Sequence, residues 1–455
     1  MHRRYRRLAD AVGTGADGRR GLYPGEPQAC RRDLRSLLRS MTQLGLLLCL
    51  FYRFQVEGRA FINLVTLATA ALPVHYLAPF RWKKPLFLAT SLAGLFLVFG
   101  TQDGAIVLAM ASGLIGICLL PIPWAARAVA LGAVGAALAA ARGPLASSTM
   151  PAVVWPVLAS MFMFRILIYM YELKHAKARE SLVDTAGYFF LLPNYCFMHF
   201  PVVDYRTLQR GYFAADVHAI QRRGLEMMSR GTLHLLAYRL IYHELLISPQ
   251  EVHDAWSLAG YVACNYLLYL RVSGQFHMAC GMLHLFGYQL PDTHHHYLLA
   301  TGFTDYWRRI NIYWKDFMVR LVFNPIVFRL KRRPQPLALG VATVVVFLAT
   351  WALHAYQSFW LRGTWGLTAP DALFWGVLGV LVLVNVQLDL RRSRGRASAR
   401  ARPEASSRGA RSLALAIRGL KTAGTLVTIA LLWSLWSSSS LGAWLELMRR
   451  GISRA

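Results

Sequence analysis

A single histidine within a long apolar run of this chain has a side chain that could do acid–base chemistry. His354 lies in VVVFLATWALHAYQSFW (344–360), and no charged residue stands three or four positions away from it. A neutral imidazole, whose free pKa is about 6.5, can accept a proton from a hydroxyl as a general base. A lone histidine on an apolar face can equally be a structural residue with a satisfied hydrogen bond. Both interpretations stay open at this point.

A second candidate group lies upstream, in TGFTDYWRRINIYWKDFMVRLVFNPIVF (301–328). It combines aromatic rings suited to a membrane interface, cations that can reach water or lipid phosphates, and the polar residues Asn311 and Asp316. We expect a helix here, on which Trp307, Asn311 and Trp314 share one face. An amphipathic helix lying in the membrane interface would explain the same composition without any catalytic role.

The composition indicates the class of protein in which these residues are positioned. Of 455 residues, 56% are hydrophobic and only 16% are charged, yet 50 Lys and Arg against 22 Asp and Glu give a net charge of +28. Such apolar content excludes a disordered chain and argues against an ordinary soluble enzyme. A soluble nucleic-acid binder would explain the charge but not the apolar runs, so we expect no nucleic-acid partner. The remaining class is a polytopic membrane protein with its Arg and Lys in cytoplasmic loops.

The apolar runs predict the elements. A helix that crosses a bilayer needs about 20 mostly apolar residues, and about 11 runs are candidates. We therefore expect an all-α, multi-pass fold with further re-entrant or interfacial helices. The runs are 42–53, 60–80, 85–100, 104–121, 125–141, 151–171, 232–248, 255–271, 337–359, 371–389 and 413–436.

The basic clusters predict the orientation. They are separated by even numbers of these runs, so all can lie on the cytoplasmic side together with the N-terminus. They lie in a basic tail at 1–40, at 81–84, at 174–179, at 331–333 and in an Arg-rich segment at 391–411 that we expect to be a flexible loop. Arg449 and Arg450 do not fit this orientation, because an odd number of spans would place them on the opposite side of the membrane. Either the count is wrong by one, or the last helix is re-entrant or interfacial.

The middle of the chain, 172–336, is apolar but contains many polar residues. Ionisable groups at membrane depth are costly, which makes this region the place to look for a site. His277 and His284 are two helical turns apart, and His294, His295 and His296 are consecutive. We interpret these histidines mainly as polar packing and a loop. The six cysteines form no CxxC pair, and we expect no disulfide framework and no metal site.

The order of several motifs resembles a known family. The segments are YFFLLPNYCFMHFP (188–201), SGQFHMACGMLHLFGYQLP (273–291), YLLATGFTDYWRRINIYWKDF (297–317) and TWALHAY (350–356). Together they resemble the membrane-bound O-acyltransferases (MBOAT), and most closely the bacterial branch of alginate O-acetylases and teichoic-acid D-alanyl transferases. The resemblance covers about residues 186–360. Elsewhere the chain is similar only in being hydrophobic.

The resemblance assigns expected roles to individual residues. His354 matches the family's catalytic histidine, and Asn311 stands where members have histidine or asparagine. Substrate-binding positions are expected at Trp307, Arg308, Arg309, Trp314, Asp316 and His277. Three positions depart from the pattern: His277 replaces an aspartate, Ala355 a glycine and Ile310 a tryptophan. These departures bear on the substrate rather than on the central pair.

The resemblance also implies a function. The expected enzyme is an O-acyltransferase that uses a tunnel through the membrane, with no permanently bound cofactor. It would move a short, acetyl-like group from an acyl-CoA or acyl-carrier thioester to a cell-envelope polysaccharide, assisted by a periplasmic acyltransferase partner. The alternatives are acylation of a lipid or a protein by the same kind of enzyme, a membrane glycosyltransferase or polymer ligase, a transporter, or a non-catalytic scaffold.

The predicted organisation has four parts. They are the cytoplasmic tail 1–40, N-terminal transmembrane helices 41–172, a catalytic core 173–360, and C-terminal transmembrane helices 361–455 that include the loop 391–411. The expected location is a bacterial inner membrane.

Overall fold

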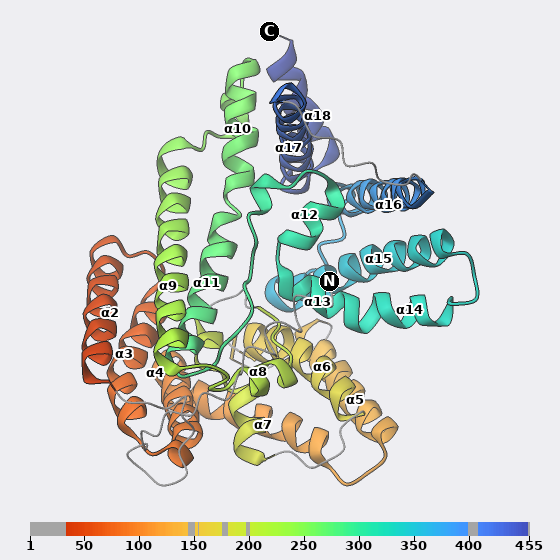
Figure 1. The fold of residues 1–455 in the computed structure, drawn as a ribbon. Coiled ribbons are helices and arrows are strands. Elements are labelled where there is room, and N and C mark those ends of the chain that lie inside the picture. The colour runs from red at the N-terminus through yellow and green to blue at the C-terminus, as the bar shows by residue number, and fades with distance from the viewer. Residues whose placement is uncertain are drawn as a thin grey trace.

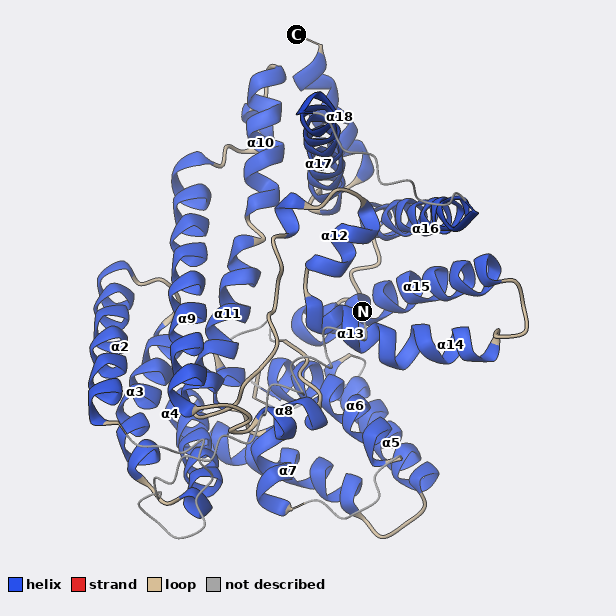
Figure 2. Ribbon diagram, viewed as in Figure 1, coloured by secondary structure: helices blue, strands red, loops and turns tan. Residues whose placement is uncertain are grey.

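The described part of the chain is helical throughout. The computed structural model describes residues 33–143, 151–152, 154–174, 181–196, 201–398 and 408–453. Figure 2 shows helices joined by loops, and no strand occurs among these residues. The predicted all-α class is confirmed. Most of the basic tail, the cluster at 174–179 beyond Lys174, and residues 399–407 lie outside the described residues.

Seven described helices are long and apolar enough to cross a membrane. They are α2 (Leu34–Phe54), α3 (Arg59–Leu77), α4 (Phe80–Leu119), α5 (Trp124–Arg142), α15 (Gln335–Arg362), α16 (Ala369–Ser398) and α17 (Arg408–Trp436). A multi-pass membrane protein is the class that these helices support. The count of 11 stays a prediction.

Five predicted spans do not correspond to five separate membrane-crossing helices. Two of the predicted spans, 85–100 and 104–121, both fall in α4, whose segments meet at Gly100 with a backbone φ of 75° and ψ of −179°. The run 151–171 forms a π-helical segment, Trp155–Phe162, followed by α6 (Met163–Leu173). The runs at 232–248 and 255–271 fall at the end of α9 (Val217–Leu240) and in α10 (Ala255–Leu267). Helix α9 begins far upstream of its apolar run because its first turns are amphipathic and are packed on protein.

The polar middle is buried in protein. Helix α11 (Leu270–Leu285) is buried at every residue from Ser273 to Leu285 and runs alongside α9 (Figure 1). Shorter helical elements make up much of the rest of this region. They are α7 (Leu182–Phe189), a 3-10 turn at Leu192–Tyr195, α8 (Tyr205–Gly211), a π-helical turn at Ile241–Leu245, and 3-10 turns at Pro249–Glu251 and Tyr297–Leu299.

The expected single helix over 301–328 is wrong. The stretch forms α12 (Phe303–Arg309), α13 (Ile312–Met318), a π-helical turn at Val319–Phe323 and α14 (Asn324–Arg329). The break falls at Ile310 and Asn311, where Ile310 is extended and Asn311 is left-handed with a φ of 39°. Trp307, Asn311 and Trp314 therefore do not share one helical face.

The expected flexible loop at 391–411 is wrong for the residues of this segment that the structure describes, 391–398 and 408–411, which are helical. Helix α16 continues through Ser398 and α17 already begins at Arg408. Arginine and alanine are strong helix formers, and no proline occurs between Pro370 and Pro403. Helix α16 can therefore extend past its apolar part. The chain then ends in α18 (Leu441–Ile452), which packs on α10 and pairs Glu446 with Arg449 and Arg450 on its exposed side. This short amphipathic helix has the character expected of an interfacial element.

Two hydrophobic clusters meet at the centre of the molecule. The larger one joins α2–α4, α6, α9 and α11, and the second joins α10, α16, α17 and α18. Trp307 packs against both clusters. The candidate site lies at this junction.

Candidate functional site

A cavity of about 780 Å³ opens between α6, α12, α13, α15, α16 and α17. Volumes of this order are typical of small-molecule sites, which combine apolar walls with a few polar groups. His354 and Asn311, predicted from separate motifs, both line it. The other polar or aromatic residues of the wall include Arg165, Tyr269, Tyr306, Trp307, Trp314, Lys315, Gln357, Arg362, Asp371, Trp375, Trp433 and Trp436.

The imidazole of His354 is surrounded by indole rings. Its ring centroid lies 4.8 Å from that of Trp375, 5.6 Å from that of Trp314 and 6.1 Å from that of Trp436. The three indoles come from α16, α13 and α17, so three separate segments meet around one side chain of α15. This packing limits both the orientation of the imidazole and the access of water to it.

Asn311 is held at the break between α12 and α13. Its Oδ1 caps α13 by accepting a hydrogen bond from the backbone N–H of Trp314 at 3.2 Å. Asparagine is one of the few residues that adopt the left-handed conformation readily and also cap helices. Because Oδ1 is engaged, the amide Nδ2 is the group left to donate a hydrogen bond.

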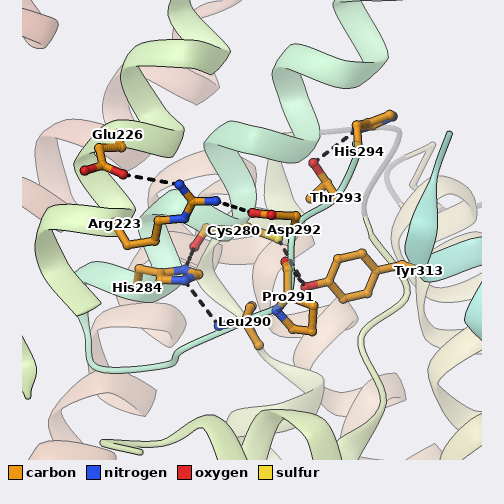
Figure 3. Close-up of polar contacts among 10 residues, drawn as sticks. All are labelled: Arg223, Glu226, Cys280, His284, Leu290, Pro291, Asp292, Thr293, His294 and Tyr313. Atoms are coloured by element: carbon orange, nitrogen blue, oxygen red, sulfur yellow. Dashed lines mark hydrogen bonds and ion pairs between the residues drawn. The ribbon is translucent and has the colours of Figure 1, made fainter. Parts of the chain in front are cut away.

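A neighbouring loop fixes this break from the other side. The backbone N–H of His295 donates to Arg309 O and that of Ile312 donates to Thr293 O, both at 2.9 Å. Tyr313 also donates its hydroxyl to Pro291 O at 2.9 Å (Figure 3). The loop 291–295 thus holds the end of α12 at one point and the start of α13 at two points, and the position of Asn311 follows from them.

His284 in turn supports the loop. Its Nε2 accepts the backbone N–H of Leu290 at 3.2 Å, so Nδ1 carries the proton and donates to Cys280 O at 2.8 Å (Figure 3). Arg223 of α9 bonds Asp292 at 2.5 Å and Glu226 at 3.2 Å in the same view. Both ring nitrogens of His284 are therefore engaged by backbone groups that fix the loop.

The remaining predicted site residues divide into two groups. Trp307 and Trp314 line the cavity, whereas Arg308, Arg309, Asp316 and His277 do not. Arg309 bonds Asp305 at 2.7 Å one turn away, and Asp316 bonds Lys315 at 2.6 Å. Arg308 is exposed. Arg308, Arg309 and Asp316 thus face the protein surface or pair with neighbouring residues rather than entering the cavity.

His277 belongs to a separate cluster. It lies between His234 and His294, with ring centroids 5.2 Å and 5.7 Å away, and its Nδ1 bonds Ser273 O at 2.6 Å. Tyr269 stands between this cluster and the cavity, since its hydroxyl bonds His294 Nε2 at 2.8 Å while the residue lines the cavity. Within the described ranges, neither these histidines nor any other three His, Cys, Asp or Glu side chains are arranged so that they could hold a metal ion.

Sequence reasoning missed several residues of the wall. Arg165 of α6 is buried and reaches Tyr188 O at 2.6 Å and Asn194 Oδ1 at 2.8 Å while lining the cavity. Asp371 and Trp436 come from the C-terminal helices, where the sequence shows only hydrophobic spans. An acid and a WSLW motif inside apolar runs were the available signals.

Comparison of the sequence with protein-family models and with curated proteins finds no match. The interpretation of the site therefore depends on the motifs and on the geometry described above.

Proposed function

We propose that this chain is a membrane O-acyltransferase similar to the MBOAT family. It transfers a short acyl group from a thioester donor, acyl-CoA or an acyl carrier, to a hydroxyl of a cell-envelope polysaccharide at a bacterial inner membrane. The observation that carries the proposal is the meeting of His354 and Asn311 in one aromatic cavity, although they lie in different helices and in separate motifs.

The proposed reaction uses each group once. The acceptor oxygen attacks the thioester carbonyl carbon, and His354 accepts the hydroxyl proton. Asn311 Nδ2 donates a hydrogen bond to the carbonyl oxygen, on which negative charge develops. The C–O bond forms, the C–S bond breaks, and the proton passes from His354 to the leaving thiolate. The indoles around His354 limit the access of water, which would otherwise compete as the acceptor.

The basic residues have different places in this proposal. Arg165, Lys315 and Arg362 line the cavity and provide positive charge for the anionic part of a donor. The exposed Arg308 can contact a donor phosphate or a lipid headgroup at the surface. A periplasmic partner that completes delivery to the polysaccharide remains part of the expectation from the resemblance.

Complementation of a deletion strain tests the proposal. Mass spectrometry of envelope glycans should show loss of an acyl group in the deletion strain and its return with the wild-type gene. The His354→Ala variant should insert into the membrane and fail to restore the acyl group. The His295→Ala variant, altered at an exposed histidine outside the cavity, should restore it. Restoration by His354→Ala would refute the assignment, and an unchanged glycan with an altered lipid or protein acyl group would correct the acceptor.

A further inference from the structure

A buried carboxylate lies in the wall of the cavity. Asp371, near the start of α16, is 8% exposed, and it is the single acid among the described residues that line the cavity. Its Oδ1 accepts the indole N–H of Trp436 at 2.7 Å, and its Oδ2 accepts the indole N–H of Trp351. A carboxylate in this environment needs such donors, because an unpaired buried charge is strongly unfavourable.

These two hydrogen bonds join three helices. Trp351 belongs to α15, Asp371 to α16 and Trp436 to α17. The carboxylate is therefore the common acceptor that sets how the helices meet at this level. The matched arrangement of two indole N–H groups on the two oxygens of one carboxylate is specific in direction, unlike the packing of apolar side chains.

One of the two indoles, that of Trp436, belongs to the aromatic surroundings of His354. Trp351 lies one turn before His354 on α15, and the ring of Trp436 lies 6.1 Å from the imidazole at 85°. Trp375, one turn after Asp371 on α16, is 4.8 Å from the imidazole. Asp371 is thus linked to the surroundings of the imidazole in two ways. It bonds Trp436 of α17, and it shares α16 with Trp375.

We infer that Asp371 is a positioning residue for His354: by holding Trp436 of α17 and by joining α16 to Trp351 of α15, its carboxylate keeps the indoles of Trp436 and Trp375 in one arrangement around the imidazole. The catalytic consequence rests on the proposed acyl transfer, whereas the positioning itself does not. Both carboxylate oxygens are occupied by indoles, so Asp371 acts through them. The C-terminal helices, which the sequence resemblance does not cover, accordingly complete the site.

The hydrogen bonds, rather than ring contact alone, distinguish Trp436 from its neighbours. Within the described residues, the indole N–H of Trp375 is buried without a partner, so this ring acts by packing only. Trp436→Phe keeps an aromatic ring and removes the bond to Asp371. Asp371→Asn keeps one acceptor oxygen and loses the other, while Asp371→Leu removes both.

The matched control lies elsewhere in the C-terminal helices. Trp444 of α18 donates its indole N–H to Ser434 Oγ at 3.1 Å and does not line the cavity. Trp444→Phe therefore removes one indole hydrogen bond of the same kind at a distance from His354. Any general loss of stability in the C-terminal helices should be common to Trp444→Phe and Trp436→Phe.

The first measurement does not depend on catalysis. The purified full-length protein in detergent is treated with diethyl pyrocarbonate at about pH 8, where a histidine of ordinary pKa is neutral. Peptide mass spectrometry then compares modification of His354 with that of the exposed His295. We expect the ratio of His354 modification to His295 modification to rise about tenfold in Asp371→Leu, because a hydrogen bond to a charged group contributes a free energy that corresponds to about this factor. The ratio should rise less in Asp371→Asn and Trp436→Phe. Trp444→Phe should match the wild type.

The second measurement uses acetyl-CoA as donor and the envelope glycan fraction as acceptor. We expect kcat to fall about tenfold in Trp436→Phe with an unchanged KM for acetyl-CoA, because a misplaced base affects the transition state and not donor binding. Unchanged modification and unchanged kcat in folded Asp371→Asn and Trp436→Phe would overturn the inference. Absence of transfer by the wild type, with the expected change in modification, would refute the proposed function and leave the positioning role intact.

Discussion

The side chain of Asn311 and the backbone of Trp314 are joined by a hydrogen bond of 3.2 Å, and the ring of that same tryptophan lies 5.6 Å from His354. The cap that begins α13 therefore also fixes the position of a ring in the wall of the cavity. The residue that ends the break between α12 and α13 also directs an indole toward the candidate base. Substitutions at Asn311 can separate these two roles, because only one of its two side-chain polar atoms is used by the cap.

The first prediction compares Asn311→Asp with Asn311→Ala. Aspartate also caps helices and tolerates the left-handed conformation, but its carboxylate cannot donate a hydrogen bond. Asn311→Asp should keep the thermal unfolding midpoint close to that of the wild type and reduce acyl transfer about 100-fold, the usual cost of removing one donor to a developing oxyanion.

Asn311→Ala should lose both roles. Removal of the cap should cost about 1 kcal/mol of stability, in addition to the same loss of transfer. Thermal unfolding in detergent and transfer from labelled acetyl-CoA measure the two effects separately. Wild-type transfer by Asn311→Asp would show that Nδ2 has no role in the reaction.

The second prediction concerns the contact between α9 and α11. A Cβ added at Gly231 would lie 2.9 Å from Gly274 O, and one added at Gly274 would lie 3.0 Å from Gly231 O. Each backbone lies where a side chain of the other helix would be. Gly231→Ala and Gly274→Ala should each force the helices apart and cost about 1–3 kcal/mol, measured as a lower unfolding midpoint.

Gly260 of α10 provides the control. Nothing lies within 4 Å of a Cβ added there, so Gly260→Ala should be neutral or stabilising by about 0.5–1 kcal/mol. A loss of stability at Gly260 as large as that at Gly231 would show that helix contact is not the reason for the glycines.

Long apolar runs made part of the fold predictable. The predicted run 125–141 corresponds to α5 (Trp124–Arg142), and 337–359 corresponds to α15 (Gln335–Arg362). In these segments composition alone selects the structure, because a membrane helix satisfies its own backbone hydrogen bonds. The motif resemblance singled out His354 and Asn311, and both residues line the same cavity.

The missed features depend on contacts between distant segments. The break at Asn311 is supported by the loop 291–295, whose hydrogen bonds to Arg309 and Ile312 no local pattern reveals. The role of Asp371 likewise requires α15 and α17 to meet at its carboxylate. In contrast, the helical extension of α16 to Ser398 could have been predicted from its Ala and Arg content.

The last prediction concerns a buried ion cluster away from the cavity. Glu172, at the end of α6 and outside the seven candidate spans, bonds Arg320 at 2.7 Å and accepts the backbone N–H of Arg206 at 3.2 Å. Arg320 also lies 3.3 Å from Asp204. Burial, together with repulsion from Asp204, raises the pKa of Glu172 from 4.5 to about 7, against the opposing attraction of Arg320.

This cluster should make stability depend on pH. Between about pH 4.5 and 7 the unfolded chain has lost the Glu172 proton while the folded protein retains it, so the unfolding midpoint should fall as pH rises and level off above about pH 7. Glu172→Gln should lack this contribution, measured as the difference between the two midpoint curves. Glu446→Gln is the control, because the pKa of the exposed Glu446, lowered to about 2 by Arg449 and Arg450, keeps it ionised throughout this range. Equal pH dependence in the wild type and Glu172→Gln would contradict the raised pKa.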